Sequence, residues 1–243
     1  MENYSEETYG ERISGVYDEW YSDFDPASVN LLAELAAGGN ALELGIGTGR
    51  IALPLMKLGV PVSGIDASQA MVSRLHAKAG GEKIQISMGN FADVAVPEKF
   101  SLVYVVFNTI FSLLTQEEQL RCFTNVADHL TPEGVFVLEA FVPDMTRFTA
   151  GQAIRLNRIE DYAVQVDVSQ HDQDKQLITS QHVLLTEQGT KFYPVRIRYI
   201  WPSEMDLMAR LAGLQLKHRW SDWKKSEFLS DSGKHISIYA LIK

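Results

Sequence analysis

The sequence predicts an α/β protein with a mostly parallel sheet that is covered by helices on both faces. Three observations support this fold class. Short apolar runs alternate with helix-like segments in a β-α-β-α-β order up to about residue 141. The first run ends in a glycine-rich segment, which is typical of a tight strand-to-helix turn. Beyond residue 143 the apolar period changes to two, which indicates an additional antiparallel sheet.

Two helical segments precede the first strand, within about residues 4–37. The first has one apolar and aromatic face, with residues three to four positions apart: Tyr9, Ile13, Val16, Tyr17 and Trp20. The second begins near Pro26 and ends at Gly38-Gly39, because proline suits a first helical turn and glycine a helix end. We expect both segments to be helices.

Five strands and the helices between them account for most of the chain up to residue 141. The expected strands are residues 41–44, 60–65, 83–88, 102–107 and 134–141. The expected helices are residues 51–58, 68–78 and 115–130. The last helix opens with a capping box, in which Thr115 and Glu118 satisfy free backbone N–H groups. We expect a turn at residues 131–134.

The antiparallel insertion spans about residues 144–201, and we expect roughly three strands in it between residues 162 and 201. A second capping box, Ser203 to Asp206, predicts the start of a helix that ends at Gly213. Two final strands, residues 214–220 and 235–242, complete the chain. Because no flexible linker is evident, we expect residues 1–243 to form a single domain.

The charge balance and the cysteine content exclude several classes of function. The 243 residues include 31 acidic and 22 basic side chains, a net charge of −9, which disfavours nucleic-acid binding. Cys122 has no partner for a disulfide or a cysteine-based zinc site, and it lies among apolar neighbours that indicate packing. No apolar stretch approaches the ~18 residues of a membrane span, and no signal peptide is visible. We therefore expect a cytoplasmic protein without a membrane partner.

The segment most informative about function is Glu43-Leu-Gly45-Ile-Gly47-Thr-Gly49, followed by Asp66 at the end of the next strand. Glycines allow the backbone to turn sharply and to approach a ligand closely. In an open parallel sheet this turn lies at the carboxyl ends of the strands, where ligands bind. An acidic residue that ends the second strand can accept hydrogen bonds from ribose hydroxyls. The glycine spacing differs from the G-x-G-x-x-G pattern of dinucleotide-binding proteins.

This combination resembles motif I of class I S-adenosylmethionine-dependent methyltransferases. The segments Met88–Asp93, Phe107–Ile110 and Leu130–Val137 resemble later parts of the same fold. The resemblance covers about residues 1–142 with the last helix and hairpin. It implies a Rossmann-like, seven-stranded, mostly parallel sheet with an antiparallel β insertion before the last helix. The insertion is similar to that of small-molecule methyltransferases of antibiotic biosynthesis, including nucleotide-sugar amine N,N-dimethyltransferases, and to azapteridine methyltransferases.

The resemblance implies S-adenosylmethionine as the cofactor and identifies candidate site residues. The cofactor-binding candidates are Tyr17, Glu43, Gly45, Gly47, Gly49, Asp66, Ala67, Asn90, Phe91 and Phe107, with Asn90 or Asp93 placed to bind the adenine amine. The first helix would cover the cofactor. The acceptor candidates are Tyr9, Trp20, Asn108, Arg198 and Trp201, together with Arg196 and Tyr199. No metal is expected, since no acidic triplet of the magnesium-dependent type is present.

The predicted reaction is an in-line transfer of a methyl group to a nitrogen or oxygen of a small heterocyclic or sugar-like acceptor, in secondary metabolism. Asn108 is followed by Thr109 and Ile110, so the [DNS]-P-P-[YF] signature of DNA and glutamine amino-methyltransferases is absent. No catalytic base is assigned, because His171, His182, His218 and His235 are equivalent at this level. The alternatives are an NAD(P)-dependent oxidoreductase and a non-catalytic S-adenosylmethionine-binding protein. The insertion could form a homodimer surface or only the roof of a pocket.

Overall fold

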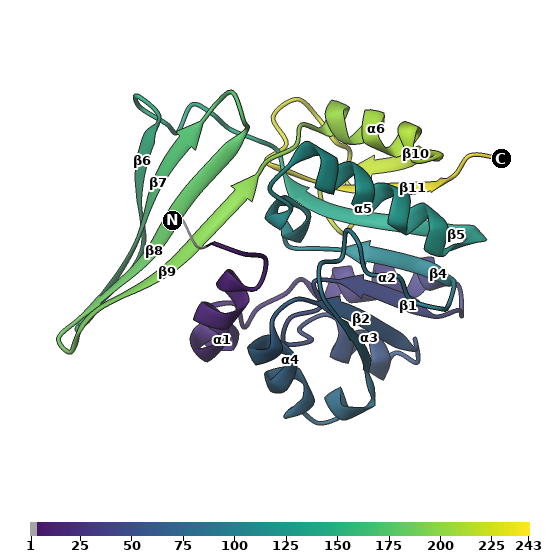
Figure 1. The fold of residues 1–243 in the computed structure, drawn as a ribbon, viewed down its shortest axis with the longest axis horizontal. Coiled ribbons are helices and arrows are strands. Elements are labelled where there is room, and N and C mark those ends of the chain that lie inside the picture. The colour runs from purple at the N-terminus through teal and green to yellow at the C-terminus, as the bar shows by residue number, and fades with distance from the viewer. Residues whose placement is uncertain (1–3) are drawn as a thin grey trace.

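A computed structural model describes residues 4–243 of the protein, in which two β-sheets stand side by side (Figure 1). The larger sheet has seven strands in the order β10-β11-β5-β4-β1-β2-β3, and the smaller has four in the order β6-β7-β8-β9. In the larger sheet strands β1 to β5 pair in parallel, and β11 is antiparallel to both of its neighbours, β5 and β10. The predicted fold class is therefore confirmed.

The strands of the larger sheet are β1 (Ala41–Leu44), β2 (Val62–Asp66), β3 (Gln85–Met88), β4 (Phe100–Val105), β5 (Leu130–Phe141), β10 (Leu214–Trp220) and β11 (Lys234–Leu241). Those of the smaller sheet are β6 (Gln152–Glu160), β7 (Ala163–Asp172), β8 (Leu177–Thr186) and β9 (Gly189–Arg198). The α-helices are α1 (Thr8–Trp20), α2 (Pro26–Ala36), α3 (Ala52–Lys57), α4 (Gln69–His76), α5 (Gln116–His129) and α6 (Pro202–Leu211). The 3-10 helices are η1 (Gly81–Lys83) and η2 (Thr109–Ser112).

Two apolar clusters hold helices against opposite faces of the larger sheet. One joins α5, α6 and η2 to the sheet and contains Phe111, Phe123 and Met208. The other joins α2 and α3 to the sheet and contains Leu32 and Leu55. The central strand β4 is almost wholly apolar, as expected for a parallel strand that is buried on both faces. None of the helices in residues 4–243 is long and apolar enough to cross a membrane.

The smaller sheet and α1 lie at the edge of the larger sheet where the parallel strands end. Figure 1 shows α1 between β9 and α4, and it contacts both of them. A third apolar cluster fixes this arrangement: Ile13 of α1 packs with Met71 of α4 and Tyr193 of β9. The chain thus places its first helix and its insertion around the edge at which ligands of open α/β sheets bind.

Three local predictions were wrong. The insertion has four strands, because β6 also forms; its side chains are mostly exposed, so they lack the apolar alternation that marks a strand. Helix α6 begins at Pro202 after the N-cap Trp201, without a side-chain cap, so the capping box at Ser203 does not form. Residues 131–134 belong to β5, whose pairing with β4 changes register between Phe100 and Leu102. The capping box of Thr115 and Glu118 is confirmed.

Candidate active site

The turn after β1 depends on glycine. Gly45 and Gly47 have φ angles of 68° and 57°, a region that L-residues with a side chain rarely adopt. The backbone N–H groups of Gly45 and Ile46 both donate to the carbonyl of Ile65 at the end of β2. A Cβ atom at Gly45 would collide with the methyl group of Thr109 in η2. The turn therefore allows the chain to pass directly beneath the segment that follows β4.

Asp66 ends β2 beside this turn and is only 9% exposed. Its Oδ2 accepts a hydrogen bond of 2.7 Å from the Gly47 backbone N–H, and its Oδ1 accepts one of 2.8 Å from the Ser68 backbone N–H. Burial raises the pKa of Asp66, while the hydrogen bonds from Ser68 and Gly47 oppose that rise. The carboxyl group is thus oriented by the backbone on both sides of the turn.

Glu43 lies behind the glycine turn, within β1. It is 4% exposed, and the hydroxyl of Tyr104 donates a 2.8 Å hydrogen bond to its Oε2. Burial raises the pKa of Glu43 to about 8, although the hydrogen bond from Tyr104 lowers it. Glu43 supports the turn from below, and it is not among the residues that line the cavity described next.

A cavity of about 360 Å³ opens in front of the glycine turn. Its walls come from the carboxyl ends of the parallel strands, from α1 and from the insertion sheet. It brings together eleven of the predicted site residues: Tyr9, Tyr17, Gly45, Gly47, Asp66, Ala67, Asn90, Phe91, Phe107, Asn108 and Arg196. A volume of this order is typical of a small-molecule site.

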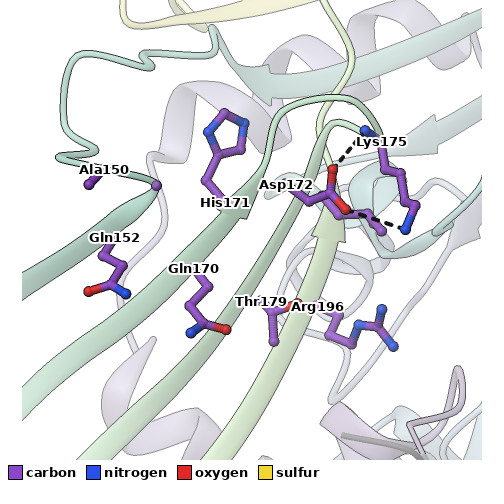
Figure 2. A pocket seen from close by; sticks show the side chains of 10 residues that line it. Ala150, Gln152, Gln170, His171, Asp172, Lys175, Thr179 and Arg196 are labelled. Carbon is purple, nitrogen blue, oxygen red and sulfur yellow. Dashed lines mark hydrogen bonds and ion pairs between the residues drawn. The ribbon is translucent and has the colours of Figure 1, made fainter.

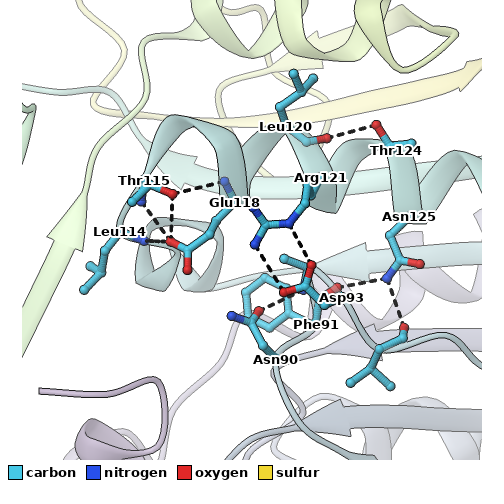
Figure 3. Close-up of polar contacts among 12 residues, drawn as sticks. Asn90, Phe91, Asp93, Leu114, Thr115, Glu118, Leu120, Arg121, Thr124 and Asn125 are labelled. Atoms are coloured by element: carbon cyan, nitrogen blue, oxygen red, sulfur yellow. Dashed lines mark hydrogen bonds and ion pairs between the residues drawn. The ribbon is translucent and has the colours of Figure 1, made fainter.

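The segment after β3 forms the wall that carries Asn90 and Phe91. The Oδ1 of Asn90 accepts a 2.9 Å hydrogen bond from the Ala92 backbone N–H, and Phe91 packs into the apolar core. From α5, the Asn125 amide donates to the carbonyl of Phe91 (Figure 3). Asp93 faces away from the cavity and forms an ion pair with Arg121 at 2.7 Å. The structure therefore leaves Asn90, and not Asp93, beside the cavity.

Helix α1 is tied to the floor of the cavity by polar contacts. The Glu11 carboxylate accepts hydrogen bonds of 2.8 Å from the Ser68 hydroxyl and 2.9 Å from the Ala70 backbone N–H, at the start of α4. The Thr48 hydroxyl donates to Asp18. On the cavity side, burial raises the pKa of Tyr17 to about 12, so its phenol is neutral near pH 7.

The segment after β4 contributes two consecutive residues with positive φ, Phe107 and Asn108, at 57° and 65°. The Oδ1 of Asn108 accepts a 2.7 Å hydrogen bond from the backbone N–H of Phe141, which holds this unusual conformation. The guanidinium of Arg50 lies 4.2 Å from the centre of the Phe107 ring. Backbone strain of this kind is common at ligand-binding sites, and here both residues line the cavity.

Six predicted site residues lie outside the cavity lining: Trp20, Glu43, Gly49, Arg198, Tyr199 and Trp201. Trp20 packs edge-on against Tyr193. Gly49 lies so close to the side chain of Leu75 that a Cβ atom there would collide with it. Arg198 is buried, and its guanidinium donates to the side chains of Gln119, Gln176 and Glu204. These contacts join the insertion to α5 and α6, so the structure gives Arg198 a packing role. Trp201 is the N-cap of α6.

The insertion sheet closes the far side of the cavity. It provides His182 from β8 and Val195, Arg196 and Ile197 from β9. Arg196 also lines a separate, open hollow on the sheet (Figure 2), at whose rim Lys175 is paired with Asp172. Tyr4, Tyr21 and Thr109 are among the lining residues for which the sequence analysis gave no site role. They are isolated polar residues at ordinary spacings, and only strand register and helix packing bring them here.

The lining residues fit S-adenosylmethionine. A side chain at Gly45 would fill space at the turn. The cavity wall then continues with the buried carboxyl group of Asp66 after β2, and with the amide of Asn90 and the ring of Phe91 after β3. Asp66 can accept hydrogen bonds from ribose hydroxyls, and Phe91 can contact a flat ring. Among the described residues, no large positively charged cluster for a pyrophosphate is part of this wall.

Comparison with known proteins agrees with this geometry. A family described as "Methyltransferase domain" matches residues 41–134. The CcbJ methyltransferase from Streptomyces caelestis is 37% identical, with a TM-score of 0.93, and the similarity covers 99% of this chain and 100% of that one. The chain belongs to the class I S-adenosylmethionine-dependent methyltransferases. The oxidoreductase alternative is thereby set aside.

Two further methyltransferases show how far the similarity extends. A probable S-adenosylmethionine-dependent methyltransferase from Mycolicibacterium smegmatis is 31% identical over 152 residues, which cover 61% of this chain and 56% of that protein. The chain spans about half the length of the curated relatives it matches. The sugar N-methyltransferase KedS8 from Streptoalloteichus shares the fold at 14% identity, with a TM-score of 0.68 over 92% of this chain and 91% of that one.

Proposed function

We propose that this methyltransferase transfers a methyl group to a nitrogen of a small-molecule acceptor in the biosynthesis of a natural product. The observation that carries the proposal is the cavity of about 360 Å³, which the insertion sheet and α1 roof over. A peptide or a nucleic acid would need an open groove. The sugar N-methyltransferase KedS8 supports a nitrogen acceptor, because it shares the fold over most of this chain.

The cofactor-binding residues follow from the lining of the cavity. Asp66 would hold the ribose, Asn90 and Phe91 the adenine, and Gly45 and Gly47 would let the backbone approach the cofactor closely. Glu43 would act from behind the turn. Tyr17 would lie near the methionine part of the cofactor, and Tyr9 and Asn108 near the acceptor. Residues 1–243 would act as one domain, in which segments 4–37 and 144–201 enclose the reacting groups.

The protein's main task in this reaction is alignment. The cofactor supplies a methyl group on a positively charged sulfur, which is already activated for displacement. The cavity residues hold the acceptor nitrogen in line with the methyl carbon and the sulfur, and positioning of this kind lowers a barrier by ~7–11 kcal/mol. The aromatic and aliphatic walls exclude water from the reacting atoms.

Cofactor binding tests the first part of the proposal. We expect calorimetric titration to show micromolar binding of S-adenosylmethionine and S-adenosylhomocysteine. Asp66→Asn and Asp66→Ala should weaken this binding about 10- to 150-fold, because charged hydrogen bonds contribute ~1.5–3 kcal/mol. Asp93→Asn is the matched control: Asp93 pairs with Arg121 away from the cavity, so its variant should bind normally. Equal affinities of the Asp66 variants and the wild type would remove the ribose role.

An acceptor screen tests the second part. The enzyme is incubated with S-adenosylmethionine carrying a trideuterated methyl group and a panel of amino sugars, heterocyclic amines and matched alcohols. We expect the label on nitrogen, located by mass-spectrometric fragmentation. If only the alcohols are labelled, the enzyme is an O-methyltransferase and the proposed N-methylation is wrong. Tight cofactor binding without labelling of any compound in the panel would favour the non-catalytic alternative.

A further inference from the structure

A histidine in the wall of the cavity is paired with a carboxylate on the adjacent strand. His182 on β8 lies directly opposite Asp167 on β7, and the His182 Nδ1 is hydrogen-bonded to Oδ1 of Asp167. Both side chains are about four-fifths buried. His182 lines the cavity that the glycine turn and α1 also line. A titratable pair thus lies where the acceptor would bind.

The hydrogen bond leaves the second ring nitrogen of His182 available. Among the hydrogen bonds of residues 4–243, none involves Nε2 of His182. When a carboxylate accepts the proton of Nδ1, the neutral ring carries its lone pair on Nε2. Burial raises the pKa of Asp167, but its hydrogen bonds with His182 and Asn157 outweigh burial and hold that pKa below its usual range. Asp167 is therefore a charged carboxylate that orients the imidazole.

The other described histidines do not line this cavity. His171 is bonded to the Tyr199 hydroxyl and stacks on Phe148, outside the lining. His129 is held by backbone groups of Asn125 and Val96. His235 is fully buried, and burial lowers its pKa to about 3. The cavity lining therefore distinguishes His182 from histidines that the sequence left equivalent.

We propose that His182, oriented by Asp167, is the general base that removes a proton from the acceptor amine. This inference rests on the proposed N-methylation. An alkyl ammonium group has no lone pair, so its N–H proton must first move to Nε2 of His182. The neutral amine then forms the new N–C bond while the C–S bond breaks and its electrons remain on sulfur. The imidazolium afterwards releases its proton to solvent. In this scheme His182 is a catalytic residue and Asp167 a positioning residue.

Several other titratable groups surround the pair. Arg155 of β6 faces Asp167 across the strand pair, and Tyr193 of β9 faces His182. The remaining charged or titratable groups near the pair or on the cavity wall are Tyr4, Glu6, Tyr9, Tyr17, Tyr21, Asp66, Arg147 and Arg196. Burial raises the pKa of the four lining phenols above the ordinary value, so they stay neutral near pH 7: Tyr4, Tyr9, Tyr17 and Tyr21.

The test compares His182→Gln and Asp167→Asn with the wild type, using the amine of the screen that the wild type methylates fastest. We expect His182→Gln to lower kcat/KM about 10²-fold at pH 7 and to leave S-adenosylhomocysteine binding unchanged. In His182→Gln, where no base removes the ammonium proton, kcat/KM should follow the unprotonated fraction of the free amine and begin to fall at a higher pH than in the wild type. Wild-type kcat/KM should decline only at more acid pH. In Asp167→Asn this decline should move to lower pH, because the imidazolium loses the negative charge beside it. His171→Gln, on the same sheet, should keep the wild-type profile.

A second measurement does not depend on turnover. The ring nitrogens of His182 are followed by NMR between pH 4 and 9 in the complex with S-adenosylhomocysteine, and we expect a lower titration midpoint in Asp167→Asn. If the wild type methylates amines and His182→Gln keeps the wild-type rate and pH profile, the base assignment is wrong, while the proposed N-methylation stands. If the wild type methylates only alcohols or nothing, the proposed N-methylation fails, and the inference fails with it.

Discussion

Burial gives the two acidic residues of the glycine turn different properties. Glu43 lies behind the turn with Tyr104 as its hydrogen-bond partner, whereas Asp66 receives two backbone hydrogen bonds and faces the cavity. The pKa of Glu43 rises to about 8 because burial disfavours its charged form. A buried carboxyl group of this kind lowers the stability of the fold, a cost that is common beside ligand sites.

The first prediction concerns Glu43→Gln. The pKa of Glu43 is about 8 in the folded protein and near 4.5 when unfolded, so the contribution of Glu43 to stability declines as the pH rises from about 4.5 to 8 and is level above that range. The substituted glutamine side chain would not titrate. We expect the variant's gain in unfolding free energy over the wild type to grow between pH 5 and 8, by ~1 kcal/mol per pH unit. Urea unfolding at several pH values measures it.

The exposed residue Glu34, which pairs with Lys225, provides the control for this prediction. Glu34→Gln should follow the wild type at every pH, because an exposed ion pair contributes little to stability. A Glu43→Gln curve parallel to that of the wild type would show that Glu43 titrates alike in the folded and unfolded states.

At the scale of elements, α1 acts as a lid whose position depends on a few contacts with α4. Glu11 caps the start of α4, and Gly10 lies so close to Ser68 that a Cβ atom there would collide with it. On its other side α1 packs against Tyr193 of the insertion. Because Tyr9 and Tyr17 line the cavity from this helix, the docking of α1 should influence cofactor binding.

We therefore expect Glu11→Ala to loosen α1. One Glu11 hydrogen bond is exposed and the other partly buried, and their loss should cost about 1 kcal/mol, or a several-fold loss of S-adenosylhomocysteine affinity. Hydrogen exchange followed by mass spectrometry should show faster exchange in residues 8–20, and calorimetry gives the affinity. Glu7→Ala is the control, because Glu7 makes no side-chain cap bond. Unchanged exchange in Glu11→Ala would mean that apolar packing alone holds the helix.

The insertion sheet presents an apolar face to solvent. Strand register places Ile154 beside Val168 and Leu156 beside Val166, and the same face continues to Phe192. Ile154 is 78% exposed and Phe192 57% exposed. Contiguous apolar surfaces of this kind usually mark interaction sites. The edge strand β6 adds unpaired backbone groups to the same region.

The corresponding prediction is a homodimer formed through this face. We expect sedimentation velocity to show self-association of the wild type at micromolar concentration and a monomer for the double variant Ile154→Glu/Phe192→Glu, since each charge would be buried without a partner. Leu211→Glu is the control: Leu211 is 75% exposed on α6, outside the sheet. A monomeric wild type at every concentration tested would leave the insertion as a cavity roof only.

Local patterns determined the parallel sheet, the glycine turn and the acidic residues Glu43 and Asp66, because each depends on residues that are neighbours in the sequence. The capping box at Thr115 formed for the same reason, since both of its partners lie within one helical turn. The box expected at Ser203 did not form, because Pro202 takes the first helical position and shifts the start of α6. Strand β6 was missed since exposure removes the apolar alternation.

Which polar residues meet at the cavity depends on how the strands and helices pack together. Asp167 and His182 come together through the register of β7 and β8. Arg198 instead contacts Glu204 and Gln119, because the insertion packs on α5 and α6. A strand's sequence shows which residues share a face, but it does not specify the partner across the sheet. The physical reason is that register and docking depend on the summed contacts of whole elements, which no short sequence pattern contains.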